Sequence, residues 1–133
     1  YSLGDEVYVN LHRGDSTMGR DTLYKVEQQQ LVRIADAKSF INLIKDGESI
    51  YYTDFNPMMP FTDNLKKVQL KTGETSTIGE PGYSYGIART ITEQSGTRYT
   101  SNDSLYIHDG MLYVLGYQES DLEDKSAVYK WNM

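Results

Sequence analysis

Hydrophobic side chains along this chain alternate with polar ones, and no segment keeps the spacing of an amphipathic helix. The apolar runs are short, rich in β-branched or aromatic residues, and bounded by Gly, Asp, Asn or Ser, which is typical of β-strands. Strands are predicted at residues 7–9, 31–34, 40–44, 50–52, 68–70, 105–107, 111–114 and 127–129. The best helical candidate is the short stretch 87–93. The pattern therefore predicts an all-β chain.

Two Asp-Gly dipeptides, Asp46-Gly47 and Asp109-Gly110, each follow a predicted strand and precede another. Asp and Gly tolerate the positive φ that tight hairpin turns require. Both dipeptides are therefore predicted to be hairpin turns.

The chain also resembles itself at a nearly fixed offset. Three tyrosine-bearing strands are each followed by a second strand that carries a basic residue. The separations are 16 residues from Tyr8 to Tyr24, 15 from Tyr51 to Lys66 and 16 from Tyr113 to Tyr129. With a polar outer strand such as 74–78, the unit has four short strands, and Tyr8 lies 43 residues before Tyr51. Four antiparallel strands every 40–50 residues or so is typical of a β-propeller blade.

The middle copy carries a family resemblance. Tyr51-Tyr52-Thr53-Asp54 resembles the Tyr-Trp-Thr-Asp repeat of propellers of the low-density-lipoprotein-receptor type, and residues 41–54 followed by 65–73 are similar to related repeats in exported proteins of Gram-positive bacteria. The resemblance implies a propeller-like fold and an extracellular or cell-surface location, with a cytoplasmic one still open. It implies little about function, because the motif is structural.

One domain is expected over residues 1–133, with repeat units near 4–46, 47–109 and 110–133. That is about two and a half repeats, whereas a closed propeller usually has 4 to 8 blades. The chain begins with Tyr1 rather than Met, which suggests a processed product or a piece of a longer protein. Three interpretations stay open: part of a longer propeller, a ring completed by self-association, or a small β-barrel or sandwich.

The second unit is longer than the first. From Tyr51 to Tyr113 is 62 residues, against 43 from Tyr8 to Tyr51, so it carries 19 extra residues. Nearly all of the excess is expected at about 79–102. Loops inserted in a rigid β scaffold often hold binding residues.

The insertion contains Gly82-Tyr83-Ser84-Tyr85-Gly86, which has the G-x-S-x-G pattern of the nucleophilic serine in α/β-hydrolases. Such a serine follows a buried hydrophobic strand, but residues 72–81 are polar and interrupted by Gly and Pro. Asp103 and His108 follow in the order of a hydrolase triad, yet His108 stands where the other repeat has Lys45. Ser84 is therefore predicted to lie in a turn, and the chain is predicted not to be an enzyme.

Ligand-binding candidates in the insertion are tyrosines and arginines, which combine flat apolar area with a polar tip. They are Tyr83, Tyr85, Arg89, Arg98 and Tyr99. The alternative is that the tyrosines anchor the insertion on its own domain.

A second candidate surface is the apolar loop at 57–61, in which Met58, Met59 and Phe61 are predicted either to contact a partner or to fold over the domain.

Charge and composition exclude several classes. The net charge of −6 and the pI near 4.8 disfavour nucleic acid and anionic membranes as partners, and no apolar run is long enough to span a bilayer. The chain has no cysteine and two histidines, which excludes thiolate and histidine-rich metal sites. The acidic groups Asp15 and Asp21, and Asp121, Glu123 and Asp124, match no calcium-loop template, and are expected in solvated hairpin loops. No metal or cofactor is predicted.

The sequence thus favours a non-catalytic binding, sensing or interaction module of an exported protein, with a protein or a glycan as partner and self-association or a longer parent chain open. One alternative is a small β-barrel that binds a small apolar ligand. A second is the accessory propeller part of a hydrolase whose active site lies elsewhere.

Overall fold

The computed structural model describes residues 1–14, 19–56, 64–92, 96–101, 105–120 and 126–133, with backbone only for 87–92 and 96–101. Within these ranges the chain forms fourteen β-strands and no helix. The prediction of an all-β chain is confirmed for the described residues.

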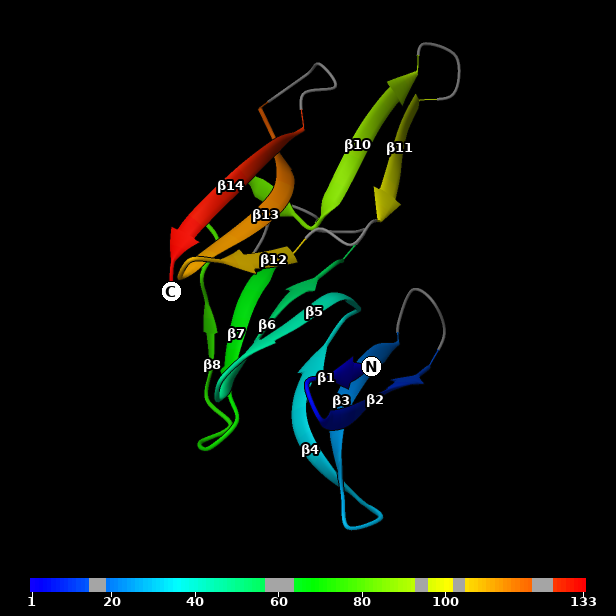
Figure 1. Ribbon diagram of the computed structural model, residues 1–133. Coiled ribbons are helices and arrows are strands. Elements are labelled where there is room, and N and C mark those ends of the chain that lie inside the picture. Colours follow the sequence, from blue (N-terminus) through cyan, green and yellow to red (C-terminus); the bar gives the residue numbers. More distant parts are fainter. Residues whose placement is uncertain (15–18, 57–63, 93–95, 102–104, 121–125) are drawn as a thin grey trace.

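Most strands belong to three antiparallel sheets of four strands each, which we call sheets I, II and III (Figure 1). Sheet I holds β1 (Ser2–Leu3), β2 (Glu6–Arg13), β3 (Arg20–Glu27) and β4 (Gln30–Ala37). Sheet II holds β5 (Phe40–Asp46), β6 (Ser49–Asp54), β7 (Leu65–Gln69) and β8 (Thr75–Thr77). Sheet III holds β12 (Leu105–His108), β13 (Met111–Gln118), β14 (Ala127–Asn132) and the short β9 (Tyr83–Tyr85). None of these sheets closes on itself as a barrel.

The remaining strands, β10 (Ile87–Thr92) and β11 (Gly96–Ser101), form a separate antiparallel hairpin. The prediction of a helix at 87–93 is therefore wrong. Four of the six residues of β10 are Ile or Thr, whose branched side chains disfavour helix and suit a strand that has a partner.

Both predicted hairpin turns are present, but their Asp-Gly dipeptides do not stand in equivalent places. The pair Asp46–Ser49 closes the turn in sheet II, whereas His108–Met111 closes the turn in sheet III. His108 therefore corresponds to Asp46 and not, as the sequence suggested, to Lys45. The cause is a one-residue shift that an alignment on the Asp-Gly dipeptides cannot detect.

In each sheet, the tyrosine of the second strand lies directly opposite a lysine of the third strand. The pairs are Tyr8–Lys25, Tyr51–Lys67 and Tyr113–Lys130. In sheet II, the lysine Nζ lies 5.7 Å from the centroid of the tyrosine ring, within range of a cation–π contact. This shared register gives every residue on the second strand of one sheet a counterpart in the other two.

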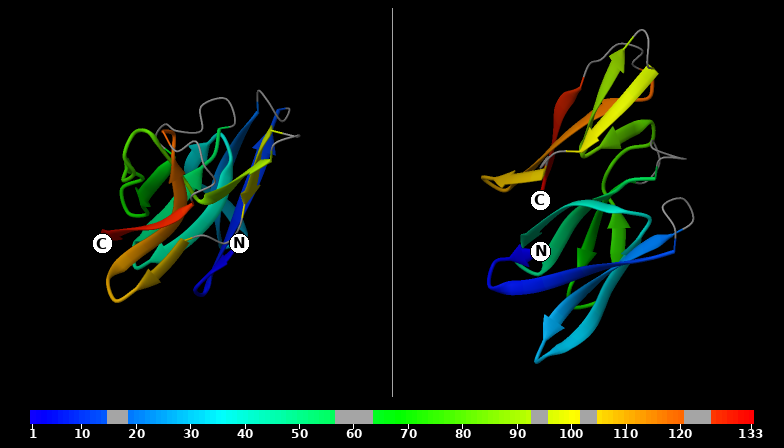
Figure 2. Two further views of the ribbon diagram at one scale, coloured as in Figure 1. Left: turned by 90° about the horizontal axis from the view of Figure 1, so that it is seen from above. Right: turned by 90° about the vertical axis from the view of Figure 1, so that its right-hand side faces the viewer.

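Each sheet has two faces that we name by their second strands. Face A carries Val7 in sheet I, Ile50 in sheet II and Leu112 in sheet III. Face B carries the neighbouring tyrosine, since successive side chains of a strand point to opposite faces. Face A of sheet II packs on face B of sheet I, and face A of sheet III packs on face B of sheet II. Sheet II is thus buried on both sides, and the sheets follow one another as a stack (Figures 1 and 2).

Two hydrophobic clusters hold the stack together. The cluster between sheets I and II is built from buried Tyr8, Leu23, Ala35, Ala37, Phe40, Ile50, Tyr52 and Val68. The cluster between sheets II and III is built from buried Tyr51, Leu65, Tyr85, Leu105, Leu112 and Val114. Burial of side chains of this size typically contributes about 1.5–3 kcal/mol each, so the sheet-to-sheet contacts are the main source of stability.

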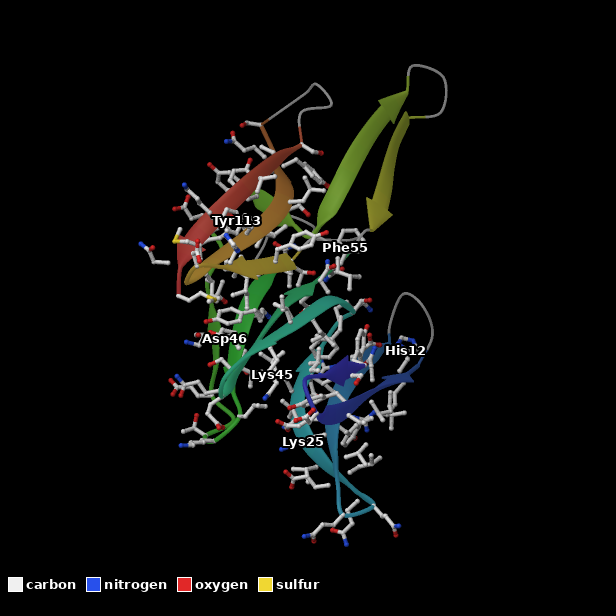
Figure 3. All side chains as sticks on the ribbon, in the orientation of Figure 1. His12, Lys25, Lys45, Asp46, Phe55 and Tyr113 are labelled. Carbon is white, nitrogen blue, oxygen red and sulfur yellow. The ribbon has the colours of Figure 1, made fainter. Side chains whose placement is uncertain are left out.

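The ion pairs of Glu6 reinforce the junction of sheets I and II. Its carboxylate lies 2.6 Å from Lys25 Nζ in its own sheet and 2.9 Å from Lys45 Nζ in sheet II. The two lysines, labelled in Figure 3, come from adjoining sheets. Hydrogen bonds from Lys25 and then Lys45 lower the pKa of Glu6 to about 2. Glu6 therefore links the two sheets as an anion between two cations.

The first strand of sheet III is made from two separate pieces. β12 pairs with the first half of β13, and β9 pairs with the last three residues of β13. Both pieces run antiparallel to β13. Together they occupy the place that β5 has beside β6. The chain leaves this strand after Gly86 and rejoins it at Leu105, so the hairpin β10–β11 is inserted within a strand position.

Candidate functional site

The motif at 82–86 forms strand β9, and the prediction of a turn at Ser84 is wrong. Ser84 pairs with Tyr117 of β13, and positive φ angles at Gly82 (87°) and Gly86 (86°) bend the chain on either side. The three-residue alternation is too short to be recognised as a strand without its partner. Polar residues before the motif do not prevent pairing, because the pairing partner comes from much later in the chain.

Two buried asparagines of the neighbouring sheet hold β9 in place. The Asn64 side chain donates to the Tyr85 carbonyl oxygen (2.8 Å) and accepts from the Tyr85 N–H (3.3 Å). The Asn64 side chain thus hydrogen-bonds the backbone N–H and C=O on the edge of β9 that faces away from β13, as a neighbouring strand would. Asn42 Nδ2 donates to the Gly86 carbonyl oxygen (3.1 Å). A side chain at Gly86 would collide with Asn42 and Thr53, since its Cβ would lie 2.6–2.8 Å from their atoms.

The tyrosines of β9 belong to an aromatic cluster with Tyr129 and Trp131 of β14. Tyr85 is edge-on to Tyr129 (ring centroids 5.7 Å apart) and to Trp131 (5.1 Å), and it is stacked with Tyr83 (5.8 Å). Such aromatic pairs add about 0.5–1.5 kcal/mol beyond the area they bury. The cluster fixes β9 on sheet III.

Tyr83 and Tyr85 differ in exposure. Tyr85 is buried, its hydroxyl accepts a hydrogen bond from the Glu80 N–H (3.1 Å), and burial raises its pKa. Tyr83 is half-buried, and its hydroxyl accepts from Gln118 Nε2 (3.2 Å) in an exposed position. Tyr85 therefore acts as an anchor, whereas Tyr83 remains partly exposed to solvent.

A shallow open pocket of about 510 Å³ lies beside Tyr83. It is lined by Pro81, Gly82, Tyr83, Gln118, Glu119 and Ser120. The Glu119 N–H donates to the Gly82 carbonyl oxygen (2.7 Å), which joins the two segments that form the pocket. The residues that line the pocket thus include a tyrosine, a glutamine, a glutamate and a serine. Sequence reasoning found Tyr83 but missed Gln118 and Glu119, whose only signal is their place at the end of the third tyrosine-bearing strand.

The other predicted ligand-binding residues lie on the hairpin that starts directly after Gly86. Arg89 of β10 is paired with Tyr99 of β11, and Thr90 is paired with Arg98. Arg89 and Tyr99 are thus direct cross-strand neighbours, and Arg98 is adjacent in the ladder. Their backbone connection to β9 keeps them in the same inserted segment as Tyr83.

Several residues that the sequence singled out lie outside the described part of the chain. They are Asp15, Met58, Met59, Phe61, Asp103, Asp121, Glu123 and Asp124. Except for Asp103, they belong to the connections between the second and third strands of the three sheets.

The structure does not bring Ser84 and His108 together. Ser84 is opposite Tyr117, whereas His108 is opposite Met111, so their partners are six residues apart on β13. Six residues of extended strand span about 20 Å. The Ser84 side chain is buried, and its hydroxyl makes no hydrogen bond within the described ranges.

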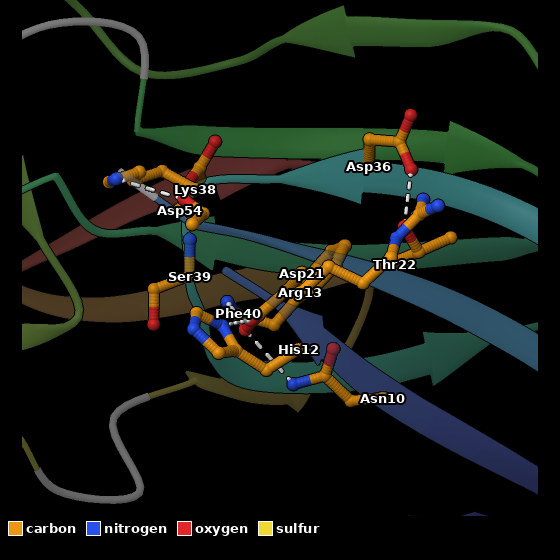
Figure 4. Close-up of polar contacts among 11 residues, drawn as sticks. Asn10, His12, Arg13, Asp21, Thr22, Asp36, Lys38, Ser39, Phe40 and Asp54 are labelled. Atoms are coloured by element: carbon orange, nitrogen blue, oxygen red, sulfur yellow. Dashed lines mark hydrogen bonds and ion pairs between the residues drawn. The ribbon is translucent and has the colours of Figure 1, made fainter. Parts of the chain in front are cut away.

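A polar cluster around the buried Asp21 lies where sheet I meets sheet II (Figure 4). The Asp21 carboxylate accepts hydrogen bonds from Asn10 Nδ2 (3.0 Å) and the Phe40 N–H (3.2 Å), and it contacts His12 Nδ1 at 2.7 Å. Burial of Asp21 opposes ionisation, but these contacts outweigh it and lower the pKa of Asp21. The expectation that Asp21 lies in a solvated loop is wrong, because strands β2 and β3 extend further than their apolar residues indicate.

A polar pocket of about 370 Å³ opens near this cluster. It is lined by Gly19, Arg20, Asp36, Ala37, Lys38, Asp54 and Asn56. Several of its charges already have partners within the protein: Lys38 Nζ donates to the Gly19 carbonyl oxygen (2.9 Å), and Asp36 is paired with Arg33 (2.5 Å). The pocket therefore favours an internal structural role over ligand recognition.

Comparison with known proteins gives no relative for this chain: no family model, no curated protein and no solved structure matches it. In the described ranges, no helix is suited to crossing a bilayer. Nor does that part of the chain contain a group of three or more His, Asp or Glu side chains arranged to hold a metal ion.

Proposed function

We propose that this chain is a non-catalytic binding module of an exported protein, built from propeller-type blades. Three four-stranded antiparallel sheets that pack face to face support this proposal, as does the shared tyrosine–lysine register. The resemblance of residues 51–54 to the Tyr-Trp-Thr-Asp repeat supports both the blade assignment and the exported location.

The ligand site of this module is the pocket beside Tyr83. The observation that carries the assignment is the difference between the two tyrosines of β9: one is buried as an anchor, and the other is half-exposed at an open pocket. The inserted hairpin begins directly after Gly86 and carries the cross-strand pair Arg89–Tyr99. Inserted segments on rigid scaffolds are where binding groups gather.

A glycan is the ligand class that fits these groups best. The ring of Tyr83 offers a flat apolar surface to the C–H face of a sugar. Gln118, Glu119 and Ser120 supply hydrogen-bond donors and acceptors for sugar hydroxyls. The net charge of −6 disfavours strongly anionic ligands, so a neutral or basic glycan is expected.

The test begins with a panel of neutral, basic and acidic oligosaccharides, whose affinities are measured by calorimetry or on an array. The best ligand is then measured with Tyr83→Ala and Gln118→Ala. Each loss of a stacking surface or a hydrogen bond is expected to weaken binding by about two- to tenfold. Gln30→Ala is the matched control, because Gln30 is an exposed glutamine at a strand end in sheet I. Absence of binding across the panel, or equal binding by all three variants, would contradict the assignment.

A further inference from the structure

The two ends of the stack expose apolar sheet faces. At one end, face A of sheet I carries Val7, Leu11, Val26 and Leu31, which are 36–51% exposed. At the other end, face B of sheet III carries Tyr106 and Val128, which are 59% and 66% exposed, and the half-buried Tyr113, whereas Tyr117 near one end of the same face is buried. Six of the nine large hydrophobic residues that are exposed within the described ranges thus lie on these two faces. Exposed apolar faces of this kind commonly mark contact surfaces in soluble proteins.

Both faces have buried counterparts inside the stack. Val7 and Val26 lie directly beside the paired Tyr8 and Lys25, and they take the positions that Ile50 and Val68 have beside Tyr51 and Lys67; Ile50 and Val68 are fully buried against sheet I. Face B of sheet III centres on Tyr113, the counterpart of Tyr51, which is buried against sheet III. The same interface, face A on face B, therefore occurs twice within the chain. The exposed ends are equivalent in position to the two sides of that interface.

We propose that face A of sheet I in one copy of this chain docks on face B of sheet III in a second copy, head to tail. The occupant is a second copy because the chain carries both halves of the interface that it already uses twice internally. The contact is heterologous, so it generates a ring if the rotation between copies closes. Two copies supply six sheets, within the range of 4 to 8 that closed propellers use. The inference rests on the blade-like stacking and does not involve the Tyr83 pocket.

The first test is the mass of the chain in solution, measured by light scattering over a concentration series. The series extends to about 100 µM, a concentration above the Kd expected of a weak interface of standard size. A dimer is expected. A chain that stays monomeric over the whole series would overturn the proposal.

Two single-face variants test the geometry. Val7→Glu places a carboxylate on face A of sheet I, and Val128→Glu places one on face B of sheet III. Each is expected to raise the dimer Kd by more than about 100-fold, because docking would bury an unpaired charge. Both sites are more than half exposed in the single chain, so the fold is expected to persist, as checked by circular dichroism. Val32→Glu is the control, since Val32 is 41% exposed on face B of sheet I, outside the docking faces.

Mixing the two variants distinguishes a head-to-tail contact from a symmetric one. In a head-to-tail dimer, the intact face A of Val128→Glu can still dock on the intact face B of Val7→Glu, so the mixture forms a 1:1 dimer that neither variant forms alone. If like faces docked on each other, one variant would remain dimeric and mixing would restore nothing. That result would overturn the proposal, as would equal loss of the dimer in the Val32→Glu control. Glycan binding at Tyr83 is expected to survive in the monomeric variants, so failure of one proposal leaves the other testable.

Discussion

Removing the Asn64 side chain tests the way β9 is held in the fold. Asn64 is buried, and its carboxamide makes two hydrogen bonds to the peptide groups of Tyr85, at 2.8 and 3.3 Å. Asn64→Ala leaves one buried N–H and one buried C=O without these partners. An orphaned buried polar group costs about 1–3 kcal/mol, and the longer bond to the N–H contributes less than the shorter one. The expected loss of unfolding free energy is therefore about 2–4 kcal/mol.

The assay is equilibrium unfolding in urea at neutral pH, followed by far-ultraviolet circular dichroism and by the fluorescence of Trp131, which is packed against Tyr85. The matched control is Asn132→Ala, because Asn132 is exposed on β14. Its effect is expected to stay within about 0.5 kcal/mol. An Asn64→Ala variant that unfolds at the same urea concentration as the control would refute the role of Asn64 as the substitute for a neighbouring strand.

Two further predictions concern the backbone and the ion pairs. Gly86→Ala is expected to lower the unfolding free energy by about 1–3 kcal/mol more than Gly73→Ala does in the same urea assay. Both residues have positive φ (86° and 71°), but of the two only Gly86 would place a Cβ in collision, 2.6 Å from Thr53 Oγ1. Equal losses in the two variants would contradict the close packing at Gly86. Glu6, whose pKa is lowered from 4.5 to about 2 chiefly by Lys25, is expected to contribute stability that is complete above pH 4.5 and lost as the pH falls toward 2. Thermal melts from pH 6 to pH 2 test this, and Glu6→Gln should have a shallower dependence on pH than the unaltered chain; identical slopes would contradict it.

The strands of the three sheets could largely be predicted because their signal is local. Residues 50–52 and 111–114 alternate apolar and β-favouring side chains next to turn residues, and both lie in strands of the structure. The offset between tyrosines also gave the right correspondence, since Tyr8, Tyr51 and Tyr113 take the same place in their sheets.

What could not be predicted depends on partners that are distant in the sequence. The Tyr-Ser-Tyr of β9 becomes a strand only because β13, some thirty residues later, and the Asn64 side chain pair with its two edges. Asp21 is buried because Asn10 and His12 face it across a hairpin, and no run of residues around Asp21 announces this. Contacts between segments that are distant in the sequence are not indicated by the apolar and polar pattern of either segment.

The pocket beside Tyr83 was found only in part for the same reason. Tyr83 was a candidate because of its residue type and its place in an insertion. Gln118 and Glu119 come from the end of another strand, and they reach the pocket only because the ladder puts Gln118 opposite Tyr83. Residue type identified a binding group, whereas the register decided which groups share a site.

A map of backbone amide chemical shifts on titration with the oligosaccharide that binds best tests the glycan site most directly. The largest changes are expected on Tyr83, Gln118, Glu119 and Ser120 and in the β10–β11 hairpin, while the strands of sheet I stay unchanged. Changes centred on the pocket between sheets I and II, or no saturable change with any glycan, would contradict the assignment of this chain as a glycan-binding module.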